Sequence, residues 1–393
     1  MAKVLLYSIL LIVGMILSQL LPRWTGGSET AAHVIQVLTF TALAFIMIHV
    51  GYEFDIDKKR KAQYASDFAI AMTAASFPWL LVSGYFVLVM GPPGSATSWD
   101  QWRDELLVGC FAAPTSAGVL FSMLAAAGLS ATWLFKKARI LAIFDDIGTI
   151  LLLIPLKIMI VGLEWQLAIV VFIMVALLAV AWFLLHKVQI PMSWPWVIAY
   201  AIVLVAFSEC LAWAGSIHVE VLLPSFVLGC VIAQPRRADG SIDHTHHEPK
   251  GAEAIAGTLV SAIFLLLVGL SMPHLDKISS HPNATDPVEA INWGMIALHV
   301  LAVTILSNLG KMFPAFCYRK EASLKTRIAL CVGMWPRGEV GAGILVIALA
   351  YHIGGQTVLV AVISLALNLV LTGAFILTVK KLLQGEPAGA VAA

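Results

Sequence analysis

The chain has 393 residues, of which 60% are apolar and 12% are charged, and its formal net charge is +1. Soluble domains carry about a quarter charged residues, so this composition excludes an ordinary soluble protein and predicts a polytopic membrane protein. The near-neutral charge balance provides no basic surface, and we expect no nucleic-acid partner.

Apolar segments follow one another along the whole chain, joined by short polar connections. A membrane-spanning helix needs about 20 mostly apolar residues. On that criterion we expect an all-α protein of about 12 transmembrane helices. These spans are 3–21, 33–51, 66–90, 106–128, 138–161, 166–186, 195–213, 218–234, 253–272, 291–317, 327–352 and 356–379.

The positions of Lys and Arg predict the orientation of these spans, because cytoplasmic connections carry an excess of both. With the N-terminus inside, the cytoplasmic connections carry 18 such residues, including Lys136 and Lys137. The outer connections carry three, which are Arg23, Arg103 and Lys277. We therefore expect both termini in the cytoplasm.

Two predicted spans contain helix-breaking residues near their middle. The fourth holds CFAAPTSAGVL, with Pro114, and the eleventh holds MWPRGEVGAGIL, with Pro336. Each is the fourth member of a five-span set, spans 1–5 and spans 8–12, and the two sets enter the membrane from opposite sides. Inverted five-helix repeats with paired broken helices are typical of transporters whose site lies at the middle of the membrane.

The fifth span carries two adjacent acids, Asp145 and Asp146, in the otherwise apolar stretch ILAIFDDIGTILLLIPL. A charged side chain at the bilayer centre costs roughly 2.5–3.5 kcal/mol on insertion scales. Lys311 of the tenth span is expected at nearly the same depth, and adjacent helical residues point about 100° apart. We expect Lys311 to neutralise one carboxylate and a mobile cation or proton to occupy the other.

Other polar residues near the breaks are candidates for supporting roles. The hydroxyls of Thr115 and Ser116 either supply oxygen ligands to a cation or bond to their own helix backbone. Arg337 and Glu339 are two residues apart and point in nearly opposite directions, so we expect Arg337 to form a salt bridge with other core helices. Asn308 is expected to bond across a helix interface.

Two further features complete the set of candidates. Asn368 follows Pro336 by 32 residues, as Asp146 follows Pro114, and we interpret Asn368 as the counterpart of Asp146 in the second repeat. A histidine-rich stretch either senses pH, binds a metal or is a solvated cytoplasmic loop, and the lack of other ligands favours the loop. Its histidines are His244, His246 and His247.

The combination of motifs resembles a known family. The Asp145–Asp146 doublet, APTS in the fourth span, GK at Gly310–Lys311 and PRGEVG in the eleventh span are similar to bacterial cation/proton antiporters of the monovalent cation:proton antiporter-2 group. The resemblance implies that Asp146 binds Na⁺ or a proton in turn and that Asp145 pairs with Lys311. It also implies electrogenic exchange of Na⁺ or Li⁺ for H⁺, no enzyme activity, and no cofactor besides the transported ions.

The resemblance further implies a homodimer in the lipid bilayer of a bacterial inner membrane. Residues 1–65 and 191–272 would form a dimerisation domain. Residues 66–161 and 291–381 would form a mobile core domain, and residues 162–190 would supply a linker helix between the two.

Two alternatives stay open from the sequence. A K⁺/H⁺ antiporter or a K⁺ efflux protein of the same fold would differ only in its ion, because selectivity depends on the size of the site and the number of its ligands. An intramembrane aspartyl protease needs two aspartates that face each other from separate helices. The adjacent positions of Asp145 and Asp146 make that alternative the weaker one.

Overall fold

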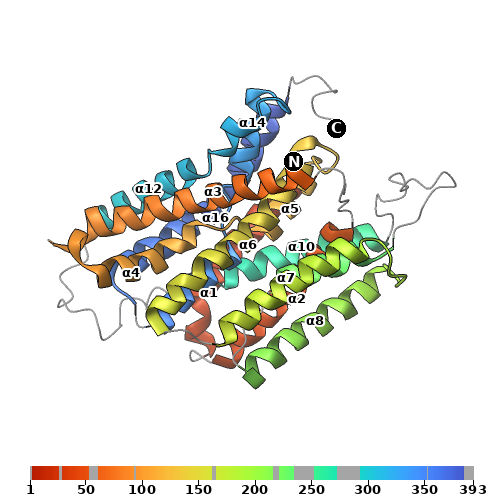
Figure 1. Cartoon of the computed structure of the whole chain (residues 1–393), viewed down its shortest axis with the longest axis horizontal. Coiled ribbons are helices and arrows are strands. Elements are labelled where there is room, and N and C mark those ends of the chain that lie inside the picture. Colours follow the sequence, from red (N-terminus) through yellow and green to blue (C-terminus); the bar gives the residue numbers. More distant parts are fainter. Residues whose placement is uncertain are drawn as a thin grey trace. The chain divides into compact units, whose positions relative to one another are not determined.

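The computed structural model describes residues 2–25, 29–52, 61–92, 94–161, 165–215, 221–233, 252–271, 293–351 and 353–384. Within these ranges the regular structure is helical, apart from one isolated bridge between Val188 and Ile232, and Figure 1 shows the long helices. The expected all-α architecture is confirmed. The predicted histidine-rich loop, His244 to His247, lies outside the described residues.

Many of the described helices are apolar enough for a membrane. Seven of them are also long enough to cross it: Lys3–Leu20, His33–Tyr52, Ala62–Met90, Trp99–Ala126, Trp194–Trp213, Trp293–Cys317 and Gln356–Leu383. The shorter apolar helices are Ala168–Leu184, Leu222–Val231, Ile255–Leu270 and Val340–Leu349. These findings confirm a polytopic membrane protein, while the count of twelve spans in inverted repeats stays a prediction.

The described helices divide between two compact units. The first unit contains α1 (Ala2–Thr25), α3 (Lys61–Tyr85), η2 (Phe86–Met90), η3 (Ser95–Thr97), α4 (Trp99–Gly109), η4 (Cys110–Ala112), α5 (Ala117–Ala126), α6 (Trp133–Val161), α12 (Trp293–Gly310), α13 (Pro314–Cys317), α14 (Leu324–Gly333), α15 (Glu339–Ala350) and α16 (Gln356–Leu383). The second unit contains α2 (Glu29–Tyr52), α7 (Trp165–Leu184), α8 (Trp194–Gly215), α9 (Leu222–Val231) and most of α10 (Ala252–Leu270). The dimerisation, linker and core roles expected for parts of the chain stay predictions.

In the first unit, α16 packs against α1, α12 and α14. Gly373 allows the close approach of α1, because a Cβ at this position would lie only 2.3 Å from Ser8 Oγ. Helices α3 and α12 lie side by side (Figure 1), and the Tyr85 hydroxyl is 2.8 Å from Nδ1 of His299. Both halves of the first unit, before and after residue 268, are thereby packed into one body that holds the polar residues described below.

In the second unit, α2 packs against α8 and α9. The backbones of α2 and α9 touch at two glycines, since a Cβ at Gly51 would lie 2.1 Å from Phe226 O and a Cβ at Gly229 would lie 2.1 Å from Ile48 O. Lipid-embedded helices commonly associate through such small residues, because hydrocarbon supplies no hydrophobic driving force between them.

Candidate functional site

Two helices of the first unit are interrupted midway, as the sequence predicts. One begins as α4, passes through η4, loses helical structure around Pro114 and resumes as α5. The other ends as α14 at Gly333, runs through Pro336 without helical structure and resumes as α15. Proline lacks a backbone donor and clashes with the preceding turn, so each proline disfavours a continuous helix at its interruption.

The two interruptions meet, and we refer to residues 113–116 together with residues 334–338 as the crossing. The Ser116 amide donates to the Pro336 carbonyl at 2.9 Å, and the Thr115 hydroxyl donates to the Met334 carbonyl at 3.0 Å. A Cβ at Gly338 would lie 2.8 Å from Ser116 Oγ, so glycine permits this approach. Backbone groups that the breaks release are thus satisfied by each other, as buried polar groups in a membrane require.

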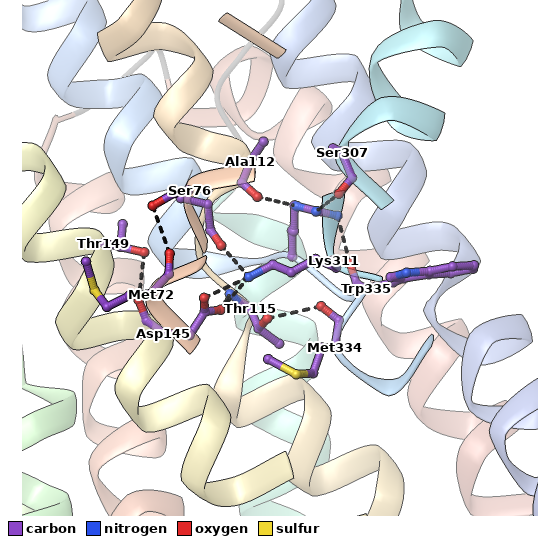
Figure 2. Close-up of polar contacts among 12 residues, drawn as sticks. Met72, Ser76, Ala112, Thr115, Asp145, Thr149, Ser307, Lys311, Met334 and Trp335 are labelled. Carbon is purple, nitrogen blue, oxygen red and sulfur yellow. Dashed lines mark hydrogen bonds and ion pairs between the residues drawn. The ribbon is translucent and has the colours of Figure 1, made fainter. Parts of the chain in front are cut away.

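A buried ion pair lies beside the crossing (Figure 2). Lys311 Nζ is 2.6 Å from Asp145 Oδ2 and 2.8 Å from Oδ1, and neither side chain is exposed. The Thr115 amide donates to Asp145 Oδ2 at 2.8 Å, while Lys311 Nζ also donates to the Ala113 carbonyl at 2.5 Å. The pair is therefore bonded directly to the interrupted backbone.

Asp146 is the next residue of α6 and is 2% exposed. Its side chain leaves the helix about 100° away from that of Asp145. The site therefore contains two buried carboxylates and the ammonium group of Lys311, which bonds to both oxygens of Asp145. Lys311 follows the last residue of α12 and lies in the turn before α13.

The hydroxyls of Thr115 and Ser116 have structural partners in the crossing. Thr115 Oγ1 donates to a carbonyl of the opposite interruption. Ser116 Oγ accepts a hydrogen bond of 3.4 Å from the amide of Val119 and caps the start of α5, a common role for serine. A hydroxyl that donates one hydrogen bond can still accept through its oxygen, so a role of Thr115 as ligand is chemically compatible with its bond to Met334.

Arg337 is fully buried and joins the crossing to α12 and η4. Its guanidinium donates to Asn308 Oδ1 at 2.7 Å, Ser307 O at 2.7 Å, Ala112 O at 3.0 Å and Trp335 O at 3.0 Å. We expected a salt bridge here, but these partners are neutral oxygens among the described residues. The planar guanidinium has five donors, and the breaks supply carbonyls that it satisfies.

The remaining predicted residues lie as follows. Asn308 of α12 accepts a hydrogen bond from Arg337, which lies in the second interruption and not on a helix. Asn368 is buried in α16, where its Nδ2 donates to Ser364 O in the same helix at 3.1 Å. Glu339 is the first residue of α15, and its side chain lies outside the described part of the structure. The proposed equivalence of Asn368 and Asp146 stays a prediction.

A second buried charge cluster was not predicted. Lys137 Nζ lies 3.2 Å from Asp67 Oδ2 and 3.0 Å from Glu321 Oε2, and the Tyr318 hydroxyl donates to Asp67 Oδ1 at 2.7 Å. Burial raises the pKa of the Tyr318 phenol above its ordinary value, and the negative charge of Asp67 raises it further. Lys137 is predicted in a cytoplasmic connection, whereas it is a residue of α6, which begins at Trp133, and its side chain is buried.

Comparisons with known proteins agree with this architecture. A solved structure, that of the sodium proton antiporter MjNhaP1 from Methanocaldococcus jannaschii at pH 8, is similar to this chain with a TM-score of 0.58. The sequences are 15% identical over 94% of this chain and 92% of that chain, so the likeness is one of fold. No curated protein sequence matches the chain.

The family comparison covers almost all of the sequence. The model described as "Sodium/hydrogen exchanger, transmembrane" matches residues 3–383, a range that includes both interruptions and the Lys311–Asp145 pair. The chain therefore belongs to the sodium/hydrogen exchanger family of transmembrane proteins.

Proposed function

We propose that this protein is a secondary antiporter that exchanges Na⁺ or Li⁺ for H⁺ across a bacterial inner membrane. The observation that carries the proposal is the fully buried Lys311–Asp145 pair at the crossing, with the second buried carboxylate, Asp146, at the next position. Membership of the sodium/hydrogen exchanger family supports the same activity. The narrower assignment to the monovalent cation:proton antiporter-2 group, of the aspartate-doublet type, is part of this proposal.

In the proposed mechanism, Na⁺ and the proton compete for the carboxylate of Asp146. Hard cations bind oxygen ligands, and the crossing brings two neutral hydroxyls, Thr115 and Ser116, and backbone carbonyls into the same region. An ionised carboxylate is costly to move through a hydrophobic barrier. Asp146 therefore changes its accessible side only when Na⁺ or a proton neutralises it, and this condition couples the two fluxes.

The resemblance implies exchange of two protons for one Na⁺, which moves net charge. In this proposal Asp146 carries one proton, and Lys311 releases the second when Asp145 changes partner. Alternating access then follows from movement of a core domain, residues 66–161 and 291–381, relative to a dimerisation domain in a homodimer. The first compact unit contains both of these core segments, and also residues 1–27, so it supports movement of the two core segments as one body.

The experiment uses purified protein in proteoliposomes with a pH-sensitive dye inside. An imposed Na⁺ gradient should drive proton movement with the wild type, and Asp146→Asn should abolish that movement while the protein remains folded. Asp100→Asn is the matched control, because Asp100 is 80% exposed and the substitution removes the same charge. Normal exchange in Asp146→Asn would overturn the proposal.

Replacing Na⁺ by Li⁺ and by K⁺ in the same assay identifies the ion. Proton movement with K⁺ but not with Na⁺ would establish the K⁺/H⁺ alternative. Charge movement is measured separately as a transient current on a solid-supported membrane. The wild type should give a current, and Lys311→Gln should exchange ions without one, whereas an undiminished current in that variant would contradict the role given to Lys311.

A further inference from the structure

Arg337 carries a buried positive charge that the mechanism proposed above does not use. The side chain is fully buried within the second interruption. Its hydrogen-bond partners in the described part of the chain are neutral oxygens, namely three backbone carbonyls and the side-chain amide oxygen of Asn308. A guanidinium group stays charged in proteins, and a buried charge is costly unless an opposite charge lies nearby. The charge of Arg337 therefore needs a countercharge beyond its own hydrogen-bond partners.

The aspartate doublet supplies that countercharge. Asp145 acts electrostatically on Arg337, and Lys311 is acted on by Arg337 and by both carboxylates of the doublet. The four groups thus form one charge cluster at the crossing. Among the described side chains this cluster has no net charge while Asp146 is ionised and Lys311 is protonated. Lys311 pairs directly with Asp145, which leaves Arg337 to balance Asp146.

The backbone just before the first interruption holds the two cations close together. Arg337 Nε donates to Ala112 O at 3.0 Å, and Lys311 Nζ donates to the carbonyl of the next residue, Ala113, at 2.5 Å. Consecutive Cα atoms are about 3.8 Å apart, so the two cationic groups lie within about 10 Å of each other. At the effective dielectric constant of a protein interior, one charge at that distance changes the binding of another ion by roughly tenfold.

The guanidinium is also fixed in place. Its two terminal nitrogens donate to Asn308 Oδ1 and Ser307 O, both at 2.7 Å, and so hold it against α12. The carbonyl of Asn308 in turn accepts from the amide of Lys311 at 3.2 Å. Because Arg337 is bonded on several sides, its charge stays beside the site when a cation enters, and a fixed charge acts on every ion that binds there.

We propose that Arg337 sets the affinity of the site for Na⁺. Its positive charge compensates Asp146 when no cation is bound and opposes the Na⁺ that binds to this carboxylate, so that the ion is held weakly enough to leave. Without this charge the buried carboxylate would retain the cation, and release would limit the exchange rate. This role rests on the proposed Na⁺/H⁺ exchange and depends on the charge of Arg337, not only on its hydrogen bonds.

Asn308→Asp cancels the charge of Arg337 without removing its bonds. The substitution replaces the amide oxygen that accepts from Arg337 by a carboxylate oxygen in a side chain of nearly the same shape. An adjacent guanidinium keeps such a carboxylate ionised. The KM for Na⁺ should fall about tenfold, and the maximal rate should also fall because release becomes slower. A KM equal to that of the wild type would overturn the inference.

Gln356→Glu is the matched control, because it adds one negative charge at the exposed first residue of α16. Both variants and the wild type are measured in proteoliposomes at one alkaline pH, where few protons compete with Na⁺ for Asp146. The KM of the control should equal that of the wild type. A KM that falls as far in the control as in Asn308→Asp would also overturn the inference, since the effect would then not depend on the place of the charge.

Two substitutions of Arg337 itself separate charge from hydrogen bonding. Arg337→Lys keeps the positive charge and loses donors, whereas Arg337→Gln loses the charge and keeps an amide donor. The KM for Na⁺ should stay near the wild-type value in the lysine variant and fall about tenfold in the glutamine variant. A purely structural role predicts no such division, so equal KM values in two folded variants would contradict the inference. If either variant fails to fold, Asn308→Asp decides.

Direct binding separates this inference from the proposed function. Radioactive Na⁺ should bind to purified Asn308→Asp in detergent about tenfold more tightly than to the wild type. A wild type that exchanges no cation for protons would contradict both the proposed function and this inference. A wild type that exchanges Na⁺ for H⁺, together with an Asn308→Asp variant of the same affinity, would contradict only the role of Arg337.

Discussion

Lys311 and Asp145 form a fully buried ion pair in which one ammonium nitrogen contacts both carboxylate oxygens, at 2.6 and 2.8 Å. The pair joins α6 to the turn after α12, and each partner also bonds to the interrupted backbone, Asp145 to the Thr115 amide and Lys311 to the Ala113 carbonyl. It therefore serves the fold as well as the proposed transport, and its removal should affect both.

Lys311→Gln should lower the free energy of unfolding by about 3–5 kcal/mol, because it leaves the carboxylate of Asp145 buried without its cation. The double variant Asp145→Asn with Lys311→Gln should recover most of that loss, since both charges are then absent. Thermal unfolding of the purified proteins in detergent measures the difference. A double variant no more stable than Lys311→Gln would show that the ion pair is not the cause.

The residue before Lys311 offers a test of how the lysine is positioned. A Cβ at Gly310 would lie 2.5 Å from the backbone nitrogen of Pro78 in α3, so Gly310→Ala should displace the end of α12. We expect a loss of about 1–3 kcal/mol in unfolding free energy, as for other overpacked positions, and a marked loss of exchange.

Gly343→Ala is the matched control, because a Cβ at Gly343 meets no atom within 4 Å among the described residues. It should leave exchange unchanged and alter unfolding by less than about 1 kcal/mol, in the stabilising direction expected for alanine in a helix. Thermal unfolding and exchange in proteoliposomes are measured on both variants. If the two variants had the same stability and the same exchange rate, α12 would tolerate the displacement at Gly310.

The interruptions and the Lys311–Asp145 pair could be predicted because the signals are strong in a membrane sequence. Ionisable residues are rare in apolar spans and must find partners there. Proline removes a backbone donor and weakens a helix through local geometry, although α3 continues through Pro78 and α6 through Pro155. Both rules act on residue type and approximate depth, which the sequence contains.

Other contacts could not be predicted because they depend on which carbonyls and which helix faces meet. Arg337 bonds to neutral oxygens that exist only where two interruptions cross. Lys137 is predicted in a cytoplasmic connection, because the orientation rule considers charge and not burial. In the structure, Asp67 of α3 forms an ion pair with Lys137. Glu105 is one of several charged residues of α4, and its burial leaves no trace in the local sequence pattern.

Tyr318 predicts a dependence of stability on alkaline pH. Burial and the neighbouring carboxylate of Asp67 raise its pKa above the ordinary value of 10.0. Below pH 10 the phenol is protonated in both states, and its hydrogen bond to Asp67 contributes fully. Above that pH the unfolded chain ionises and the folded one does not, so this contribution is lost as the pH rises.

Tyr318→Phe should therefore be less stable than the wild type at neutral pH by about 1.5–3 kcal/mol, the value for a hydrogen bond to a charged group. The difference should shrink above pH 10. Tyr200→Phe is the control, because the Tyr200 hydroxyl makes an exposed bond to Pro191 O at 3.2 Å. Chemical unfolding at a series of pH values provides the measurement, and a difference that is constant across pH 10 would contradict the argument.

The cluster around Lys137 gives the last prediction. Lys137→Met leaves Asp67 buried without its ammonium partner, and we expect a loss of about 3–5 kcal/mol, with partial recovery in the double variant that also carries Asp67→Asn. Lys136→Met changes an exposed neighbour on the same helix and should have little effect. Lys137 precedes Asp145 by eight residues, or about 12 Å along the helix, so exchange per folded molecule should stay near the wild-type rate. Loss of exchange in folded Lys137→Met would instead place this cluster within the transport pathway.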